Sequence, residues 1–135
     1  MTSLGTEVAL ALRMPVRSRQ DLKARAFDLA VLAFRLCPRL TAAGTAHALV
    51  ARQLLRSVAS IGAQLEEGAA ASSRRDMAAK YAIALREARE ANYWARLGAT
   101  DSRWAAALSP IVKETSEFVA MLTVSVKRLR APANL

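Results

Sequence analysis

The residues that usually build catalytic or metal sites are few in this chain and poorly spaced. Arginines are therefore the main side chains that could bind another molecule. The chain has one histidine, His47, and one cysteine, Cys37, so no set of nitrogen and sulfur ligands has metal-site spacing. Glu66 and Glu67 are adjacent, and adjacent positions on a helix do not face each other, which argues against shared acid–base work. We therefore expect no enzyme, no metal and no cofactor.

The positive charge is the functional lead. Lysines and arginines number 20 against 11 acids, a formal net charge of +9. Such an excess favours polyanionic partners, and the planar arginine fork suits phosphate. We expect these side chains to contact the phosphate backbone of RNA or DNA: Arg52, Arg56, Arg74, Arg75, Arg19, Lys23 and Arg25. The alternative is a solvated face that keeps an alanine-rich protein soluble.

Helices must position these residues, since apolar side chains recur at helical spacing and no strand pattern appears. The predicted helices cover residues 19–37, 45–67, 73–98 and 101–130. Pro38 is expected to end the first helix, and Gly68 to cap the second. Ser73 and Asp76 have the spacing of a capping box at the start of the third. Lys127, Arg128 and Arg130 occupy the last turn of the fourth, where cations favour the helix dipole.

Long helices with short connections predict an all-α fold, an antiparallel up-down-up-down four-helix bundle. At 135 residues the chain suits one domain, which we place at residues 19–131. Residues 1–18 are expected to form a flexible leader, and residues 132–135 a tail. No apolar run approaches the ~20 residues of a membrane span. We expect a cytoplasmic location and no membrane partner.

Two helices carry apolar residues on two faces. On the first helix, the face assigned to the core holds Phe27, Ala30, Val31 and Phe34. A second stripe on the other side, and another on the third helix, would expose large apolar groups to water, so we expect self-association. The predicted oligomer interface consists of Leu29, Leu32, Leu36, Ile83, Arg86, Glu90, Tyr93, Trp94 and Leu97. The alternative is that helix rotation is misjudged and part of a second stripe is core.

The stretch from Gln53 to Trp94 combines several fixed spacings: Q-L-x-R-S, then S-I with a glutamate six residues on, then R-E-A-R-E-x-x-Y-W. The residues concerned are Gln53, Leu54, Arg56, Ser57, Ser60, Ile61, Glu67, Arg86, Glu87, Ala88, Arg89, Glu90, Tyr93 and Trp94. They resemble the four-helix bundle family of 23S rRNA intervening-sequence proteins. A related branch is similar to the accessory variability determinant of diversity-generating retroelements. One departure is Gln64, where that family usually has asparagine.

The resemblance implies a homopentameric ring of four-helix protomers. For the related branch it implies basic pentamers that bind nucleic acid and assist a reverse transcriptase. Two functions stay open at this point. The first is a non-enzymatic, oligomeric nucleic-acid-binding accessory protein, with a reverse transcriptase as a candidate partner. The second is a structural or protein-interaction scaffold whose charge is incidental.

Overall fold

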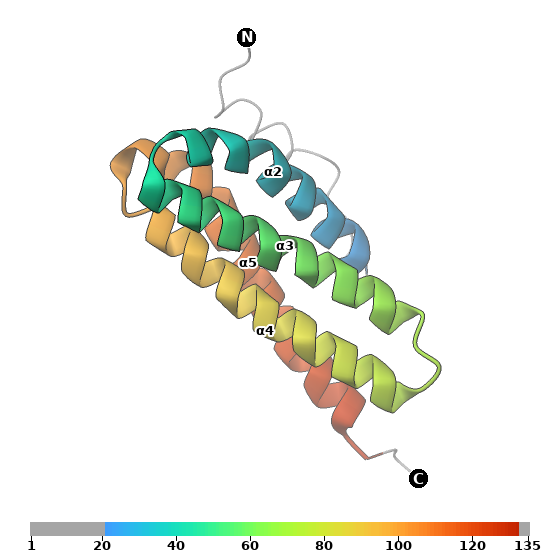
Figure 1. Cartoon of the computed structure of the whole chain (residues 1–135). Coiled ribbons are helices and arrows are strands. Elements are labelled where there is room, and N and C mark those ends of the chain that lie inside the picture. Colours follow the sequence, from blue (N-terminus) through green and yellow to red (C-terminus); the bar gives the residue numbers. More distant parts are fainter. Residues whose placement is uncertain (1–20, 133–135) are drawn as a thin grey trace.

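The structure is a computed structural model that describes residues 21–132, and within them the chain forms four α-helices and no strand (Figure 1). The helices are α2 Leu22–Ala42, α3 Thr45–Ala69, α4 Arg74–Gly98 and α5 Ser102–Arg130. The expected all-α class with four helices is confirmed. The predicted leader over 1–18, and the tail beyond Pro132, lie outside the described residues.

Short polar side chains begin three of the helices. Asp21 accepts a hydrogen bond from the Ala24 N–H at 3.3 Å, and Ser73 accepts one from the Asp76 N–H at 3.0 Å. Each satisfies a backbone donor that has no partner within its helix. Gly44 precedes α3 instead, with φ 149°, and no other described residue has a positive φ. Glycine suits this position because a Cβ would make the conformation strained.

Two predicted helix ends are wrong. Helix α2 continues through Pro38 to Ala42, although proline lacks the N–H that an interior position needs. Leu36 and Leu40 are fully buried on either side of it, and we attribute the continuation to their burial outweighing the lost hydrogen bond. Helix α3 likewise runs past Gly68 to Ala69. Gly68 instead permits close packing, because a Cβ there would lie 2.7 Å from the Tyr81 ring.

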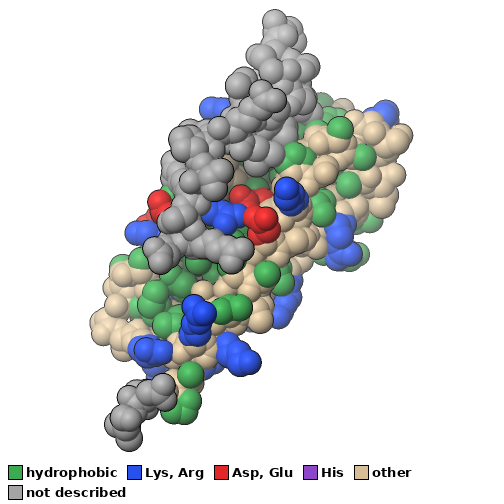
Figure 2. Space-filling view, turned by 180° about the vertical axis from the view of Figure 1, so that it is seen from behind, with side chains coloured by type: hydrophobic (Ala, Val, Ile, Leu, Met, Phe, Trp, Pro, Cys, Tyr) green, Lys and Arg blue, Asp and Glu red, His purple; other side chains and the backbone are tan. Residues whose placement is uncertain are grey.

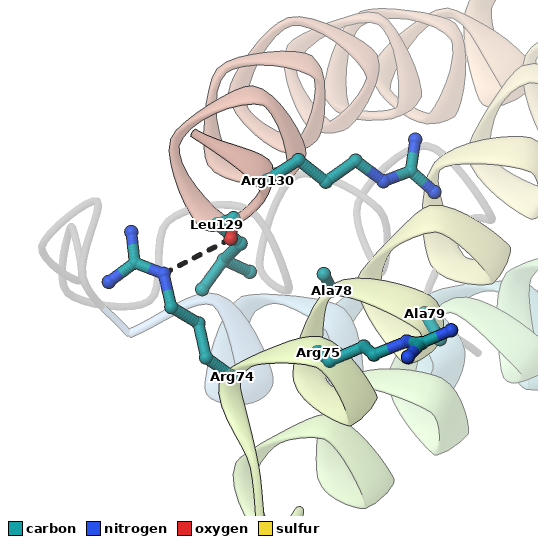
Figure 3. A pocket seen from close by; sticks show the side chains of 6 residues that line it. All are labelled: Arg74, Arg75, Ala78, Ala79, Leu129 and Arg130. Carbon is teal, nitrogen blue, oxygen red and sulfur yellow. Dashed lines mark hydrogen bonds between the residues drawn. The ribbon is translucent and has the colours of Figure 1, made fainter. Parts of the chain in front are cut away.

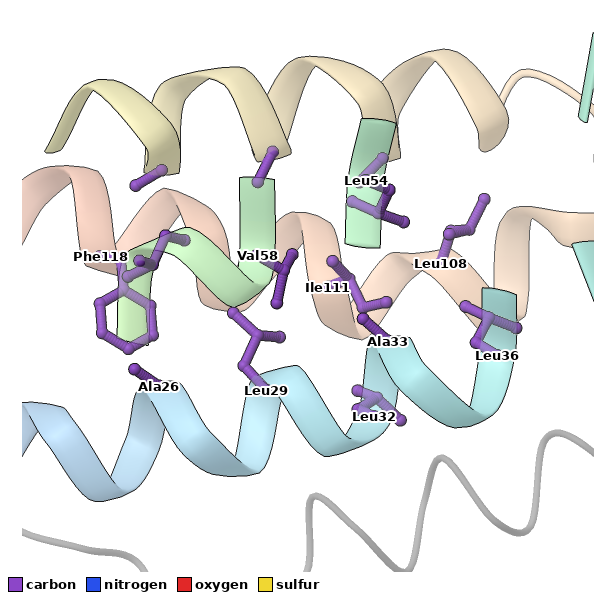
Figure 4. Close-up of a cluster of buried hydrophobic side chains, with 14 of the residues drawn as sticks. Ala26, Leu29, Leu32, Ala33, Leu36, Leu54, Val58, Leu108, Ile111 and Phe118 are labelled. Carbon is purple, nitrogen blue, oxygen red and sulfur yellow. The ribbon is translucent and has the colours of Figure 1, made fainter. Parts of the chain in front are cut away.

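The rotation of α2 differs from the prediction. Leu29, Leu32 and Leu36 are 3%, 3% and 0% exposed, whereas Phe27 and Phe34 are 67% and 70% exposed. The leucine stripe therefore faces the core (Figure 4), and the three leucines leave the predicted oligomer interface. The alternative of a misjudged helix rotation is correct for this helix. The helical spacing of Phe27, Ala30, Val31 and Phe34 did not distinguish their face from that of the leucines, which recur at the same spacing.

The core also contains the inner faces of the other helices, with Leu54 and Val58 from α3 and Ile111 and Phe118 from α5 fully buried among them. The inner face of α4 is mostly alanine, which lets neighbouring helices approach closely.

Polar contacts join neighbouring helices along their length. Asn92 on α4 donates to the Val112 carbonyl at 3.1 Å and to the hydroxyls of Thr115 and Ser116, both at 3.0 Å. Thr115 is fully buried, and its own hydroxyl donates to the Ile111 carbonyl at 2.7 Å. These bonds fix α4 against the middle of α5, because a buried polar group that loses its partner costs about 1–3 kcal/mol.

Asp101 connects the start of α5 to α3. Its carboxylate accepts from the Arg103 N–H at 3.0 Å, from the Arg103 guanidinium at 2.8 Å, and lies 2.8 Å from His47 Nε2. The hydrogen bonds from the Arg103 side chain and backbone, followed by that from His47, hold the pKa of Asp101 well below its ordinary value of 3.8. The ionised form is therefore favoured in the folded state.

We expect Asp101→Asn to lower the melting temperature at neutral pH, because the uncharged side chain binds His47 and Arg103 less strongly. A lowered folded pKa gives stability that is present above the ordinary pKa of 3.8 and is lost as the pH falls through the folded pKa. The difference in melting temperature between wild type and variant should therefore become smaller in acid. Thermal unfolding followed by circular dichroism at neutral and strongly acidic pH measures it. An equal gap at both pH values would contradict this assignment.

Candidate nucleic-acid interface

Arg25 lies between α2 and α5 rather than on a free surface. Its guanidinium donates to Glu114, and to Glu117 at 2.6 Å, and sits 5.6 Å from the centre of the Phe118 ring. Burial raises the pKa of Glu114 against the opposing effect of Arg25, while the Arg25 hydrogen bond lowers the pKa of Glu117. Two carboxylates neutralise the charge of Arg25, so it is a poorer candidate for a phosphate contact than the sequence predicted.

Arg56 also forms ion pairs within the protomer. It donates to Glu90, and to Glu87 at 3.3 Å, and so ties α3 to α4. The Arg56 hydrogen bond lowers the pKa of Glu90, which also accepts from Trp94 Nε1 at 3.3 Å. Glu87 and Glu90 thus offset the charge of Arg56, and its predicted contact with phosphate stays a prediction.

The other predicted cations do not form a continuous strip. Arg52 is exposed in the first half of α3, distant along the bundle from the start of α4. Lys23 makes a loose ion pair with Glu66 at 3.9 Å. Arg19 lies outside the described residues.

One end of the bundle does gather basic side chains, where α4 begins and α5 ends. We call this the basic end: Arg74, Arg75, Lys127, Arg128 and Arg130. Figure 2 shows lysine and arginine side chains gathered around the end of the bundle at which α5 ends. Within residues 21–132, no ion pair neutralises any of the five. Uncompensated cations in one place are what a phosphate backbone attracts.

Arg74 has a structural part in this end. Its guanidinium donates to the backbone carbonyls of Leu129 at 3.1 Å and Arg128 at 2.7 Å. Both carbonyls belong to the last turn of α5, where the carbonyl groups carry partial negative charge, and the Arg128 carbonyl also accepts from the Ala131 N–H at 3.3 Å. Arg74 therefore closes the end of α5 and holds it beside the start of α4.

A pocket opens between these two helix ends. It has a volume of about 560 Å³ and is lined by Arg74, Arg75, Ala78, Ala79, Leu129 and Arg130 (Figure 3). Arg75 reaches it from α4 and Arg130 from α5. No acidic side chain is among the residues that line it. We call it the α4–α5 pocket.

From the sequence, Lys127, Arg128 and Arg130 were interpreted only as cations that favour a helix dipole, and their place in a site was missed. They could have been found by asking which helix ends lie side by side. If consecutive helices reverse direction, the end of the fourth lies beside the start of the third, where Arg74 and Arg75 are.

The predicted interface on α4 keeps exposed apolar groups. Tyr93 and Leu97 are 53% and 43% exposed, and the Tyr93 and Trp94 rings meet edge to face with centres 5.3 Å apart. Trp94 and Ile83 are half-buried, so each is partly covered by its own protomer. Arg86 is exposed beside them.

The described residues also bear on two other kinds of site, a metal centre and a membrane span. No group of three or more histidine, cysteine or acidic side chains within residues 21–132 could hold a metal ion. None of the described helices is both long and apolar enough to cross a lipid bilayer.

Comparison with known proteins assigns the chain to a family. The model of a family described as "23S rRNA-intervening sequence protein" matches residues 19–124. A crystal structure described as a protein with unknown function from the S23 ribosomal protein family of Bacteroides thetaiotaomicron is similar, at 30% identity and a TM-score of 0.70. The match covers 78% of this chain and 98% of that one. No curated protein matches, and none of these findings concerns diversity-generating retroelements. The chain therefore belongs to the 23S rRNA-intervening sequence protein family.

Proposed function

We propose that this protein is a non-enzymatic, homo-oligomeric accessory protein that binds the phosphate backbone of a nucleic acid through its basic end. The observation that carries this proposal is the set of five cations there, which have no ion-pair partner within residues 21–132. Such a surface binds through counterion release and with little sequence preference. The family's description, which refers to an intervening sequence of 23S rRNA, favours RNA.

The proposed protomer is an antiparallel up-down-up-down bundle. Contacts that support it join Lys23 to Glu66 and Arg74 to the Leu129 carbonyl, pairing an early residue of one helix with a late residue of the next. Assembly into a ring, with five copies as the resemblance implies, would repeat the basic end around the particle and raise its affinity through several contacts at once. A reverse transcriptase as partner stays a prediction that rests on resemblance alone, as does a cytoplasmic location.

Fluorescence anisotropy with labelled structured RNA and duplex DNA, at low and moderate salt, tests the binding. We expect binding at low salt and a steep loss of affinity as salt rises, because each neutralised phosphate releases counterions. If neither nucleic acid binds at low salt, the proposal fails and the scaffold alternative takes its place.

The oligomer has its own test. Tyr93 is exposed in the protomer, so Tyr93→Asp should leave the fold intact and place a charge in the proposed interface. We expect the variant to have a lower mass than wild type by light scattering, with unchanged helix content by circular dichroism. Trp94 is a poorer choice because it packs against the protomer core. An unchanged mass would remove this face of α4 from the interface.

A further inference from the structure

The α4–α5 pocket is a partly open hollow with the volume of a small-molecule site. Its volume of about 560 Å³ lies inside the ~300–1,000 Å³ range of ligand pockets. The space exists because α4 has alanine at 78 and 79, where a longer side chain would fill it. Leu129 adds a further apolar wall. A single inorganic phosphate is much smaller than this space, so a larger ligand fits it better.

Two arginines from different helices border the apolar floor. Figure 3 shows Ala78 and Ala79 on α4 beneath the side chain of Arg130, with Arg75 extending from α4 toward the same side. Both arginines are exposed, and neither makes an ion pair within the described residues. A guanidinium can stack on the flat face of a base and can also bind a phosphate in bidentate fashion.

This combination of chemistry narrows the ligand. An apolar floor with flat cations suits a nucleobase, and the same cations suit the phosphates on either side of it. Bases in a duplex are stacked and paired, so only an unpaired nucleotide can enter a pocket. The geometry points to a subsite for one unpaired nucleotide of a single-stranded nucleic acid, with its base on Ala78 and Ala79 and its phosphates on Arg75 and Arg130. This inference rests on the proposed function and adds a preference for single strands.

The test fills the pocket without changing its charge. Ala79 is exposed, and leucine is a good helix former, so Ala79→Leu should fold normally. We expect its dissociation constant for a single-stranded RNA of about eight nucleotides to rise about tenfold, because stacking one base contributes about that factor or more. The constant for a duplex of the same sequence should change by less than about twofold, since a duplex contacts only the arginines. Ala120→Leu, at an exposed alanine on α5 distant from the pocket, should change neither.

Binding of an abasic strand distinguishes the contribution of the base from that of the phosphates. An abasic strand of equal length keeps every charge, so wild type should bind it about as weakly as Ala79→Leu binds the normal strand. Ala79→Leu should have no further effect on the abasic strand. If wild type binds abasic and normal strands equally, no base enters the pocket and the inference is overturned. Tighter binding of free uridine monophosphate than of the strand would overturn the assignment to a strand.

The two proposals can fail separately. If Ala79→Leu weakens single strand and duplex equally, or weakens neither, the nucleotide subsite is refuted while backbone binding through the basic end stands. If wild type binds no nucleic acid at low salt, the proposed function fails and the subsite fails with it.

Discussion

Leu36→Ala is expected to lower the free energy of unfolding by about 3 kcal/mol, whereas Phe34→Ala should change it by less than about 0.5 kcal/mol. Leu36 is fully buried, so its truncation removes apolar contacts and leaves a cavity. Phe34 is 70% exposed on the outer side of the same helix and loses little. Urea unfolding followed by circular dichroism measures both. The larger residue should therefore matter less to the fold.

The comparison also tests the rotation of α2 directly. If Phe34 faced the core, as its spacing had indicated, Phe34→Ala would be the more destabilising of the two. Protein concentration provides a control, because a contribution from oligomer contacts would make the unfolding midpoint depend on concentration. If the wild-type midpoint depends on concentration and Leu36→Ala removes that dependence, Leu36 belongs to an interface after all.

Arg75→Glu combined with Arg130→Glu should weaken binding to structured RNA on the order of 100-fold at low salt. The two reversals turn attraction to phosphate into repulsion in the place where no acid compensates the charge. The slope of log affinity against log salt should also become less steep by about 2, since each lost phosphate contact removes about one unit. Anisotropy titrations over a salt series measure both quantities.

A matched control separates the basic end from total charge. Arg35→Glu with Arg89→Glu makes the same change in net charge at two exposed positions. Arg89 is 14 residues after Arg75 on α4, about 21 Å along the helix at 1.5 Å per residue. We expect this variant to lose much less affinity. Equal losses in the two double variants would mean that the overall charge, and not the basic end, attracts the nucleic acid.

The four-helix class could be predicted because it follows from local patterns. The spacing of Ser73 and Asp76 marked the start of α4, and the structure shows that hydrogen bond. The rotation of α2 could not be predicted in the same way. Its phenylalanines and its leucines both recur at helical spacing, and only packing against the other helices decides which set is buried.

The candidate site was harder still, because it depends on contacts between residues distant in sequence. Nothing near Arg25 or Arg56 in the chain indicates that carboxylates on other helices neutralise them. Conversely, Arg75 and Arg130 lie far apart in sequence and line one pocket. A count of charges predicted a polyanionic class of partner, while the cations that lack an acidic neighbour could be found only from the arrangement of the helices.

Asn92 has a consequence for how α4 and α5 recognise each other. Apolar side chains on α4 are mostly alanines, which would fit their neighbours almost equally well after a slip of one helical turn. The Asn92 amide has its acceptors at one level of α5 only, at Val112, Thr115 and Ser116. A slipped pairing would carry the amide away from all three, and so this one side chain discriminates the native alignment from its near-equivalents.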